Sequence, residues 1–246
     1  MKKLIVCILC FASIQGFSQM RLGVQGSFSA LNFWQTDGYT GLTAAENTWA
    51  MNGWQAGVFG EYDLGYSGLE LQPALMYAST GAHLGQSRGF ADQGNFIIGF
   101  SDTKLKVNSL RLPVNILYTF RIDSKFKVFG GLGPYIAKNL SGTEKGHYTG
   151  YDNSNTNYTT GTFPIDNKVH ISGDPSYATL GKSNVASFDA GMDIILGFQY
   201  KKLQISGSWV RGFSRQYHTN YVNMGNQDWN FTVGYLLFGH ERKPRL

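Results

Sequence analysis

The stretch FDAGMDIILGFQY at residues 188–200 decides the fold, because it is apolar at every second position. In a helix these apolar side chains would scatter around the whole cylinder. In a strand they separate, since successive side chains point to opposite faces. One face carries Phe188, Ala190, Met192, Ile194, Leu196, Phe198 and Tyr200, and the other carries Asp189, Gly191, Asp193, Gly197 and Gln199, with Ile195 breaking the pattern. Such a strand either covers a soluble core or faces lipid around a polar interior.

The N-terminus has the pattern of a secretory signal peptide. A basic start, Met1-Lys2-Lys3, precedes an apolar run at residues 4–14, and small or polar residues follow at 17–19. The run is too short for a membrane-spanning helix, which needs about 20 residues. We therefore expect a signal peptide at residues 1–19 and one mature domain at residues 20–246.

Composition favours β structure and argues against a nucleic-acid-binding protein. The chain has 31 glycines and 15% aromatic residues, and its 15% of charged residues lies below the usual share of about 25%. Loss of Lys2 and Lys3 with the signal peptide lowers the net charge from +5 to +3. Because the basic residues are also scattered, nucleic acid is not an expected partner. Both cysteines, Cys7 and Cys10, lie in the signal peptide, so we expect no disulfide in the mature chain.

The same alternation occurs in seven further segments. They are RLGVQGSFSALN (21–32), WQAGVFGEY (54–62), LELQPALMY (69–77), LRLPVNILYTF (110–120), FKVFGGLGPYI (126–136), LQISGSW (203–209) and WNFTVGYLLF (229–238). After the signal peptide, no run approaches 18 consecutive apolar residues, so no membrane helix is expected. Eight alternating segments are instead typical of a barrel, which hides its apolar surface in every second position.

The connections between these segments alternate in length. Three are short, at 63–67, 121–125 and 201–202. The long ones cover roughly 33–52, 79–104, 138–186 and 212–227. Outer-membrane barrels combine tight periplasmic turns with long extracellular loops, and an even strand number puts both termini on the periplasmic side.

Aromatic residues fall at the two ends of the predicted strands. The expected outer set is Trp34, Trp54, Tyr77, Phe188, Trp209 and Trp229, and the inner set is Tyr62, Tyr118, Phe126, Tyr200 and Phe238. Amphipathic rings prefer these two heights, between headgroups and acyl chains. The sequence therefore predicts an all-β fold: an eight-stranded antiparallel up-and-down transmembrane β-barrel with long extracellular loops and short periplasmic turns.

Three features depart from an ideal barrel pattern. Prolines lie inside predicted strands, where each removes a ladder hydrogen bond: Pro73, Pro113 and Pro134. The apolar parity slips between Val107 and Leu110, which indicates a bulge or a strand that starts late. Three apolar side chains are expected to point inward and pack in the interior: Phe59, Leu117 and Leu236.

Four segments together resemble the PorT-like small outer-membrane barrels of Bacteroidota. They are SLRLPVNILYTF (109–120), GGLGPYIAKNL (130–140), FDAGMDIILGFQY (188–200) and NFTVGYLLFG (230–239). The resemblance implies an eight-stranded barrel in outer-membrane lipid, inserted by the outer-membrane assembly machinery. It also implies a link to type IX protein secretion or gliding, and so to secretion-apparatus proteins, which only some members have. The chain departs from the family by continuing beyond Phe238, where members often end on an aromatic residue.

The charged residues of the inward face form the candidate site: Glu61, Glu70, Arg111, Lys127, Asp189 and Asp193. An eight-stranded barrel is only wide enough for side chains to fill, so these charges should pair or reach water. We expect a closed network of salt bridges, with a narrow ion path or proton relay as the alternative. On a strand, Asp189 and Asp193 are about 13 Å apart, so no metal site and no cofactor are expected.

We expect a non-enzymatic protein with a structural or interaction role. An alternative is a membrane-embedded lipid A hydrolase, since His170-Ile171-Ser172, with Asp174 nearby, resembles the His-x-Ser of outer-membrane lipid A deacylases. Another is a soluble, lipocalin-like barrel with its apolar face turned inward. The Tyr- and Asn-rich loop at 143–170 is either a recognition surface or an ordinary hydrophilic loop.

Overall fold

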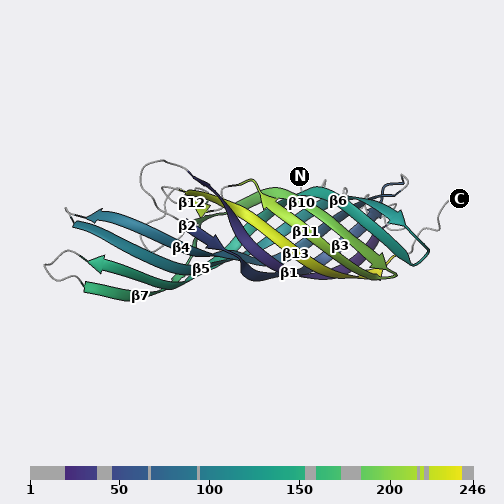
Figure 1. The fold of residues 1–246 in the computed structure, drawn as a ribbon. Coiled ribbons are helices and arrows are strands. Elements are labelled where there is room, and N and C mark those ends of the chain that lie inside the picture. The colour runs from purple at the N-terminus through teal and green to yellow at the C-terminus, as the bar shows by residue number, and fades with distance from the viewer. Residues whose placement is uncertain are drawn as a thin grey trace, which may run out of the picture.

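The fold is a closed ring of eight antiparallel strands (Figure 1). The structure is a computed structural model that describes residues 20–37, 46–65, 68–92, 95–152, 159–172, 184–214, 217–218 and 222–239. The ring strands are β1 (Met20–Asp37), β3 (Met51–Asp63), β4 (Leu69–Asp92), β5 (Asn95–Arg121), β6 (Phe126–Asp152), β10 (Phe188–Tyr200), β11 (Leu203–Gly212) and β13 (Val222–Phe238). The expected signal peptide, residues 1–19, lies outside the described residues.

The ring has the predicted up-and-down topology. Each of its strands pairs with the next one in the sequence, and the pairing of β1 with β13 closes the sheet. The all-β, eight-stranded barrel is thereby confirmed. Closure removes the unpaired sheet edge that a membrane would not tolerate. No helix among the described residues is long and apolar enough to cross a bilayer.

The two ends of the ring differ. At the end called inner here, short turns join β3 to β4, β5 to β6 and β10 to β11, the last through Lys201 and Lys202 alone. At the opposite, outer end, β4, β5 and β6 run on past the ring as a projecting sheet (Figure 1). Five short strands lie at this end: β2 (Glu46–Trp49), β7 (Thr159–Lys168), β8 (His170–Ser172), β9 (Asn184–Ala186) and β12 (Tyr217–His218).

The prediction of long loops at 79–104 and 138–186 is largely wrong, because most of the described residues in these ranges form strands. The β4–β5 ladder continues without interruption from Met76 opposite Arg111 to Asp92 opposite Asn95. β7 pairs with β6 over its whole length, so most of 143–170 is sheet rather than loop. Outside lipid a strand needs no apolar outer face, and for that reason the alternation used to find strands stops before the strands do.

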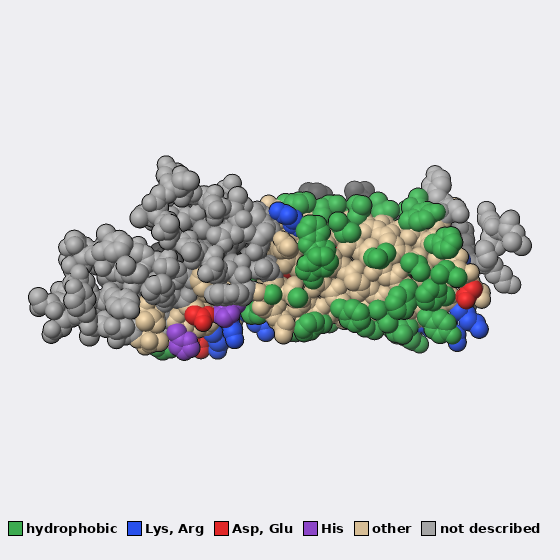
Figure 2. Space-filling model, in the orientation of Figure 1, with side chains coloured by type: hydrophobic (Ala, Val, Ile, Leu, Met, Phe, Trp, Pro, Cys, Tyr) green, Lys and Arg blue, Asp and Glu red, His purple; other side chains and the backbone are tan. Residues whose placement is uncertain are grey.

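The apolar face lies outside the ring and the polar face inside. On β10, Leu196 and Phe188 are 68% and 65% exposed, whereas Asp189 is 1% exposed. A space-filling view shows a broad band of apolar side chains on the visible face of the barrel portion (Figure 2). This arrangement is the reverse of a soluble barrel that holds an apolar ligand. The lipocalin-like alternative is therefore wrong.

Each of the three prolines lies at a break in one ladder. The β5–β6 pairs stop at Pro113 opposite Tyr135 and resume at Ile116 opposite Leu132, which leaves Pro134 within the gap. The β4–β5 ladder has a similar gap at Pro113, and the β3–β4 ladder has one at Pro73. The missing donors therefore coincide with positions where neighbouring strands do not pair.

The parity slip near Val107 is a change in the chemistry of the two faces rather than a shift within β5. The β5–β6 register does shift between Asn108 and Ser109, so a bulge is present there, but its extra residue is on β6 and leaves the parity of β5 unchanged. β5 itself keeps one parity: Val107, Ser109 and Arg111 are all buried. What changes is the chemistry, because beyond Ser109 the inward residues become apolar. They form a cluster of Ala82, Leu84, Leu105, Val107, Val169 and Val185.

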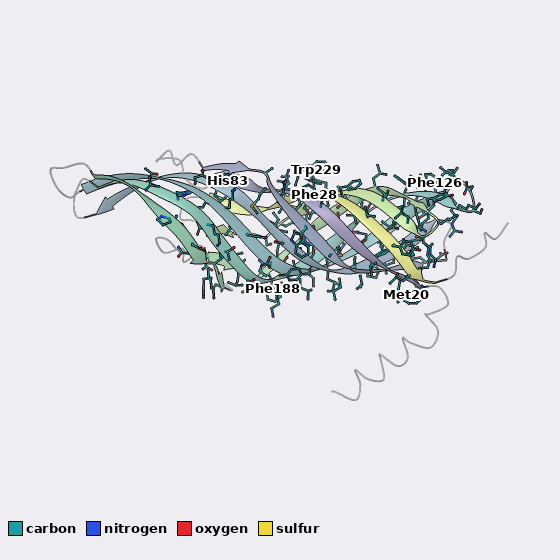
Figure 3. The ribbon with its side chains drawn as sticks, turned by 90° about the horizontal axis from the view of Figure 1, so that it is seen from below. Met20, Phe28, His83, Phe126, Phe188 and Trp229 are labelled. Carbon is teal, nitrogen blue, oxygen red and sulfur yellow. The ribbon has the colours of Figure 1, made fainter. Side chains whose placement is uncertain are left out.

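Aromatic side chains mark the limits of the apolar band. Phe126 lies near the inner end, and Phe28, Phe188 and Trp229 lie toward the middle of the molecule, with His83 beyond them (Figure 3). Trp229 and Phe238 are nine residues apart on β13. That is about 31 Å along a strand and about 23 Å in height at a tilt of about 40°, close to the apolar band of about 25 Å in outer-membrane barrels. The expected side chain of Trp34 lies outside the described residues.

Candidate functional site

The inner half of the lumen contains a charge-balanced network of four side chains, called the inner quartet: Arg21, Glu61, Glu70 and Lys127. Arg21 Nη2 lies 2.5 Å from Glu61 Oε2 and 3.2 Å from Glu70 Oε2. Lys127 Nζ lies 2.9 Å from Glu70 Oε2 and 3.4 Å from Glu61 Oε2. Gln204 Nε2 donates a hydrogen bond of 2.5 Å to Glu61 Oε1. Each carboxylate therefore contacts both cations, which offsets the large penalty for burying charge.

Counted over the described residues, the outer half of the lumen is not balanced in charge. Arg111 Nη2 donates to Asp228 Oδ2 at 3.1 Å, and the Arg111 guanidinium lies 4.5 Å from the centroid of the Tyr135 ring. The Tyr135 hydroxyl donates to Asp189 Oδ2 at 2.9 Å, and Asn226 Nδ2 donates to the same oxygen at 3.0 Å. One guanidinium thus stands among several buried carboxylates that are held mainly by neutral donors.

Asp193 is attached to this outer group through an amide. Asn115 Nδ2 donates to Asp193 Oδ2 at 3.3 Å. With Asp189 and Asp228, Asp193 brings the outer half to three carboxylates against Arg111. All three carboxylates are at least nine-tenths buried.

The structure brings together the six residues selected from the sequence in two groups. Glu61, Glu70 and Lys127 lie in the inner quartet, and the other three lie in the outer half. Two members were missed by the sequence analysis: Arg21 and Asp228. Arg21 directly precedes Leu22, and Asp228 directly precedes Trp229, the first apolar residue of its predicted strand. Extending the inward parity by one position, from Gly23 to Arg21 and from Asn230 to Asp228, would have found both.

The described part of the lumen contains a small cavity beside the two groups. A cavity of about 40 Å³ is lined by residues of both halves, including Gln72, Arg111 and Asp193. A volume of this size holds one or a few water molecules. It is about a tenth of the volume of a pocket for a small organic ligand, which starts at about 300 Å³.

The outer end holds the residues considered for catalysis. His170 is exposed and Ser172 half-buried on β8, and Asp174 lies outside the described residues. A different histidine, His83 on β4, contacts the Asp102 carboxylate on β5 through Nε2. Among the described residues, no three His, Cys, Asp or Glu side chains are grouped so as to hold a metal ion.

Comparison with known proteins shows the family to which the chain belongs. A family model described as outer membrane protein beta-barrel domain matches residues 13–217, which is most of the chain. The chain belongs to this outer-membrane β-barrel family. Its exposed apolar band accordingly lies in the outer membrane. A search of curated proteins finds no match.

Several solved outer-membrane proteins are similar to this barrel at low identity. OprG from Pseudomonas aeruginosa is 12% identical with a TM-score of 0.47, over 93% of this chain and 100% of that one. The outer membrane protease OmpT from Escherichia coli is 14% identical with a TM-score of 0.42, over 92% and 100%. The attachment invasion locus protein Ail of Yersinia pestis, solved with the heparin analogue sucrose octasulfate, is 12% identical with a TM-score of 0.35, over 89% and 99%. Such similarities carry no information on activity.

Proposed function

We propose that this outer-membrane barrel is a non-enzymatic structural or interaction protein with a closed lumen. The inner quartet carries the proposal. Its four side chains come from β1, β3, β4 and β6, and Lys127 reaches across to Glu61, two strands beyond its neighbour β5. Ion pairs therefore cross an interior that is only wide enough for side chains. The part of the molecule left to contact partners is the projecting outer sheet.

Ion conductance tests the closed lumen. The purified mature chain, inserted into planar bilayers, is expected to give no stable single-channel steps. Replacing both Glu70 and Lys127 with Ala removes half of the inner quartet and is expected to raise the ion leak. A matched control replaces the exposed pair Lys145 and Asp166, whose Nζ and Oδ2 are 3.1 Å apart, and should leave the leak unchanged. Stable steps from the unaltered chain would overturn the proposal.

The resemblance to PorT-like barrels supports a narrower role beside type IX secretion or gliding. In that role the assembly machinery inserts the barrel and secretion-apparatus proteins contact it. Deleting the gene in a bacterium that carries it should then reduce the export of secreted proteins, and the full-length gene should restore export. Unchanged export and gliding in the deletion strain would leave a structural role alone.

The lipid A hydrolase remains the competing function, and His170 and Ser172 are its candidate residues. Both are on β8 and two residues apart, so they share one face of that strand. A non-enzymatic barrel predicts that lipid A incubated with the purified chain keeps all its acyl chains, as judged by mass spectrometry. Loss of an acyl chain that disappears in the H170A and S172A variants would establish the enzyme instead.

A further inference from the structure

A group of lysines projects outward from β5, β6 and β7, from the outer edge of the apolar band to about 15 Å above it. We call it the lysine surface: Lys104, Lys106, Lys138, Lys145 and Lys168, all exposed. The strand register brings them together, because Lys104 lies opposite Lys145, while Lys106 and Lys168 lie on either side of Thr143. Basic and other charged side chains are visible where the apolar band ends (Figure 2).

The height of the lysine surface follows from the ladders. Leu110 is an exposed apolar residue near the outer limit of the band on β5, and it lies opposite Lys138, which in turn lies opposite Phe188. Lys138 Nζ is 5.9 Å from the centroid of the Phe188 ring, so this lysine is at the outer aromatic boundary. Lys106 is four residues further, which is about 13 Å along the strand and about 10 Å in height at a tilt of about 40°. The lysine surface therefore begins where hydrocarbon gives way to headgroups.

The protein supplies less negative than positive charge to this surface. Asp102, exposed on the same face of β5 and two residues from Lys104, contacts His83. Lys145 pairs with Asp166, and both side chains are largely exposed. Among the described residues, Lys104, Lys106 and Lys168 make no ion pair with a carboxylate. Like charges directly opposite each other on neighbouring strands, such as Lys104 and Lys145, destabilise a sheet. An anion from outside the chain would remove this repulsion.

The direction of the side chains identifies the source of that anion. Outward side chains stand roughly perpendicular to the strands of a barrel wall, so these lysines point sideways, into the layer of lipid headgroups, rather than up into solvent. The ammonium group of lysine is a compact point charge that binds phosphate well. We propose that the lysine surface binds phosphate groups of the surrounding outer-leaflet lipid. This inference requires the outer-membrane location and does not rest on the proposed function.

The test variant replaces Lys104, Lys106 and Lys168 with Gln. It lowers the charge by three and leaves the Lys145–Asp166 pair and the Lys138–Phe188 contact in place. A lysine near an anionic lipid surface strengthens binding by about fivefold, so three contribute about a hundredfold if they act independently. Native mass spectrometry of the mature chain in mixed micelles measures retention of diphosphorylated lipid A and of the same lipid after removal of its phosphates.

The matched control replaces Lys125, Lys201 and Lys202 at the inner turns with Gln. It makes the same change in net charge at exposed positions of the opposite end. Both variants must migrate faster on a gel without boiling than with boiling, as folded barrels do, before their lipid binding is compared.

The expected result is that the unaltered chain and the control retain diphosphorylated lipid A about a hundredfold more strongly than the test variant. All three chains should retain the dephosphorylated lipid equally weakly, and added salt should reduce the difference. Equal retention of the two lipids by the unaltered chain would overturn the proposal, as would equal binding by all three chains. Tighter binding of a soluble sulfated oligosaccharide than of lipid A would also overturn it, in favour of a soluble polyanionic partner.

Discussion

At the scale of single residues, Lys127 is the clearest test of how the lumen is held together. It contacts both carboxylates of the inner quartet and is 5% exposed. Lys127→Met leaves two buried carboxylates with Arg21 alone. The expected loss in free energy of unfolding is about 3–5 kcal/mol, because an uncompensated buried charge remains. Urea unfolding in lipid vesicles, followed by gel migration, measures it.

A second substitution separates charge from packing at this position. Adding Glu70→Gln to Lys127→Met removes the surplus negative charge and leaves Arg21 with Glu61. The double variant should recover at least half of the lost stability. If it is no more stable than Lys127→Met, the loss comes from packing of the lysine stem rather than from charge.

Asp123 in the turn between β5 and β6 responds to pH. Its Oδ1 accepts hydrogen bonds from the backbone N–H groups of Lys125 at 2.5 Å and Phe126 at 2.8 Å, and these bonds lower the pKa of the carboxyl below its ordinary 3.8. The stabilisation of the turn is thus fully present above pH 3.8 and is lost as the pH falls through the lower, folded-state pKa.

An NMR titration in micelles checks this prediction for Asp123. The amide signals of Lys125 and Phe126 should shift with a midpoint below 3.8 in the unaltered chain, and the shift should vanish in Asp123→Asn. A midpoint at or above 3.8 would contradict the hydrogen-bonded turn.

The sequence predicted which side chains point into the lumen, but not which of them pair. Parity along β3, β4, β5, β6 and β10 was enough to predict that Glu61, Arg111 and Asp189 point inward. Which charge meets which depends on how far each strand is staggered against the next, and alternation along one strand carries no such information. For this reason the division into a balanced inner quartet and an acidic outer half emerges only from the structure.

At the scale of elements, the projecting sheet has a small core of its own. Leu105 and Val107 alternate with Lys104 and Lys106, so β5 reads apolar inside and polar outside beyond the band. Inside the band the same strand reads the other way. The apolar residues thus move from the outward to the inward face at the point where β5 leaves the lipid. A search for outward apolar residues therefore ended the strand too early.

Leu105→Asp tests whether this core is separate from the ring. A buried, unpaired carboxylate among Ala82, Leu84 and Val107 should open the projecting sheet, because the charge has no partner there. Proteinase K should then cut the outer segments at least tenfold faster, while the ring keeps its heat-dependent gel migration. Lys106→Asp, at the neighbouring exposed position, is the control and should resist cleavage. Loss of the folded gel band in Leu105→Asp would show that ring and sheet fold as one unit.

At the scale of the whole molecule, the two aromatic boundaries fix its position in the membrane. Trp229 is at the outer boundary and pairs through Trp209 with Ile194, so the exposed Leu196, two residues nearer the inner end of β10, lies about halfway down the band. A variant that keeps Trp229 as its only tryptophan should be quenched most by lipids brominated near the headgroup. Leu196→Trp in a tryptophan-free background should be quenched most by lipids brominated near the chain ends. Equal quenching of both variants at every depth would contradict this position of the apolar band in the bilayer.

The length of the β4–β5 hairpin has a consequence for whatever meets this protein from outside. From Tyr77 at the boundary to Asp92 the strand runs 15 residues, which is about 50 Å along the strand and about 38 Å in height if the tilt of about 40° persists. More of this hairpin stands clear of the bilayer than is anchored in it. A macromolecule too bulky to approach the membrane would still reach the hairpin's tip, whereas one that must touch Lys138 would first have to penetrate the sugar layer of the cell surface.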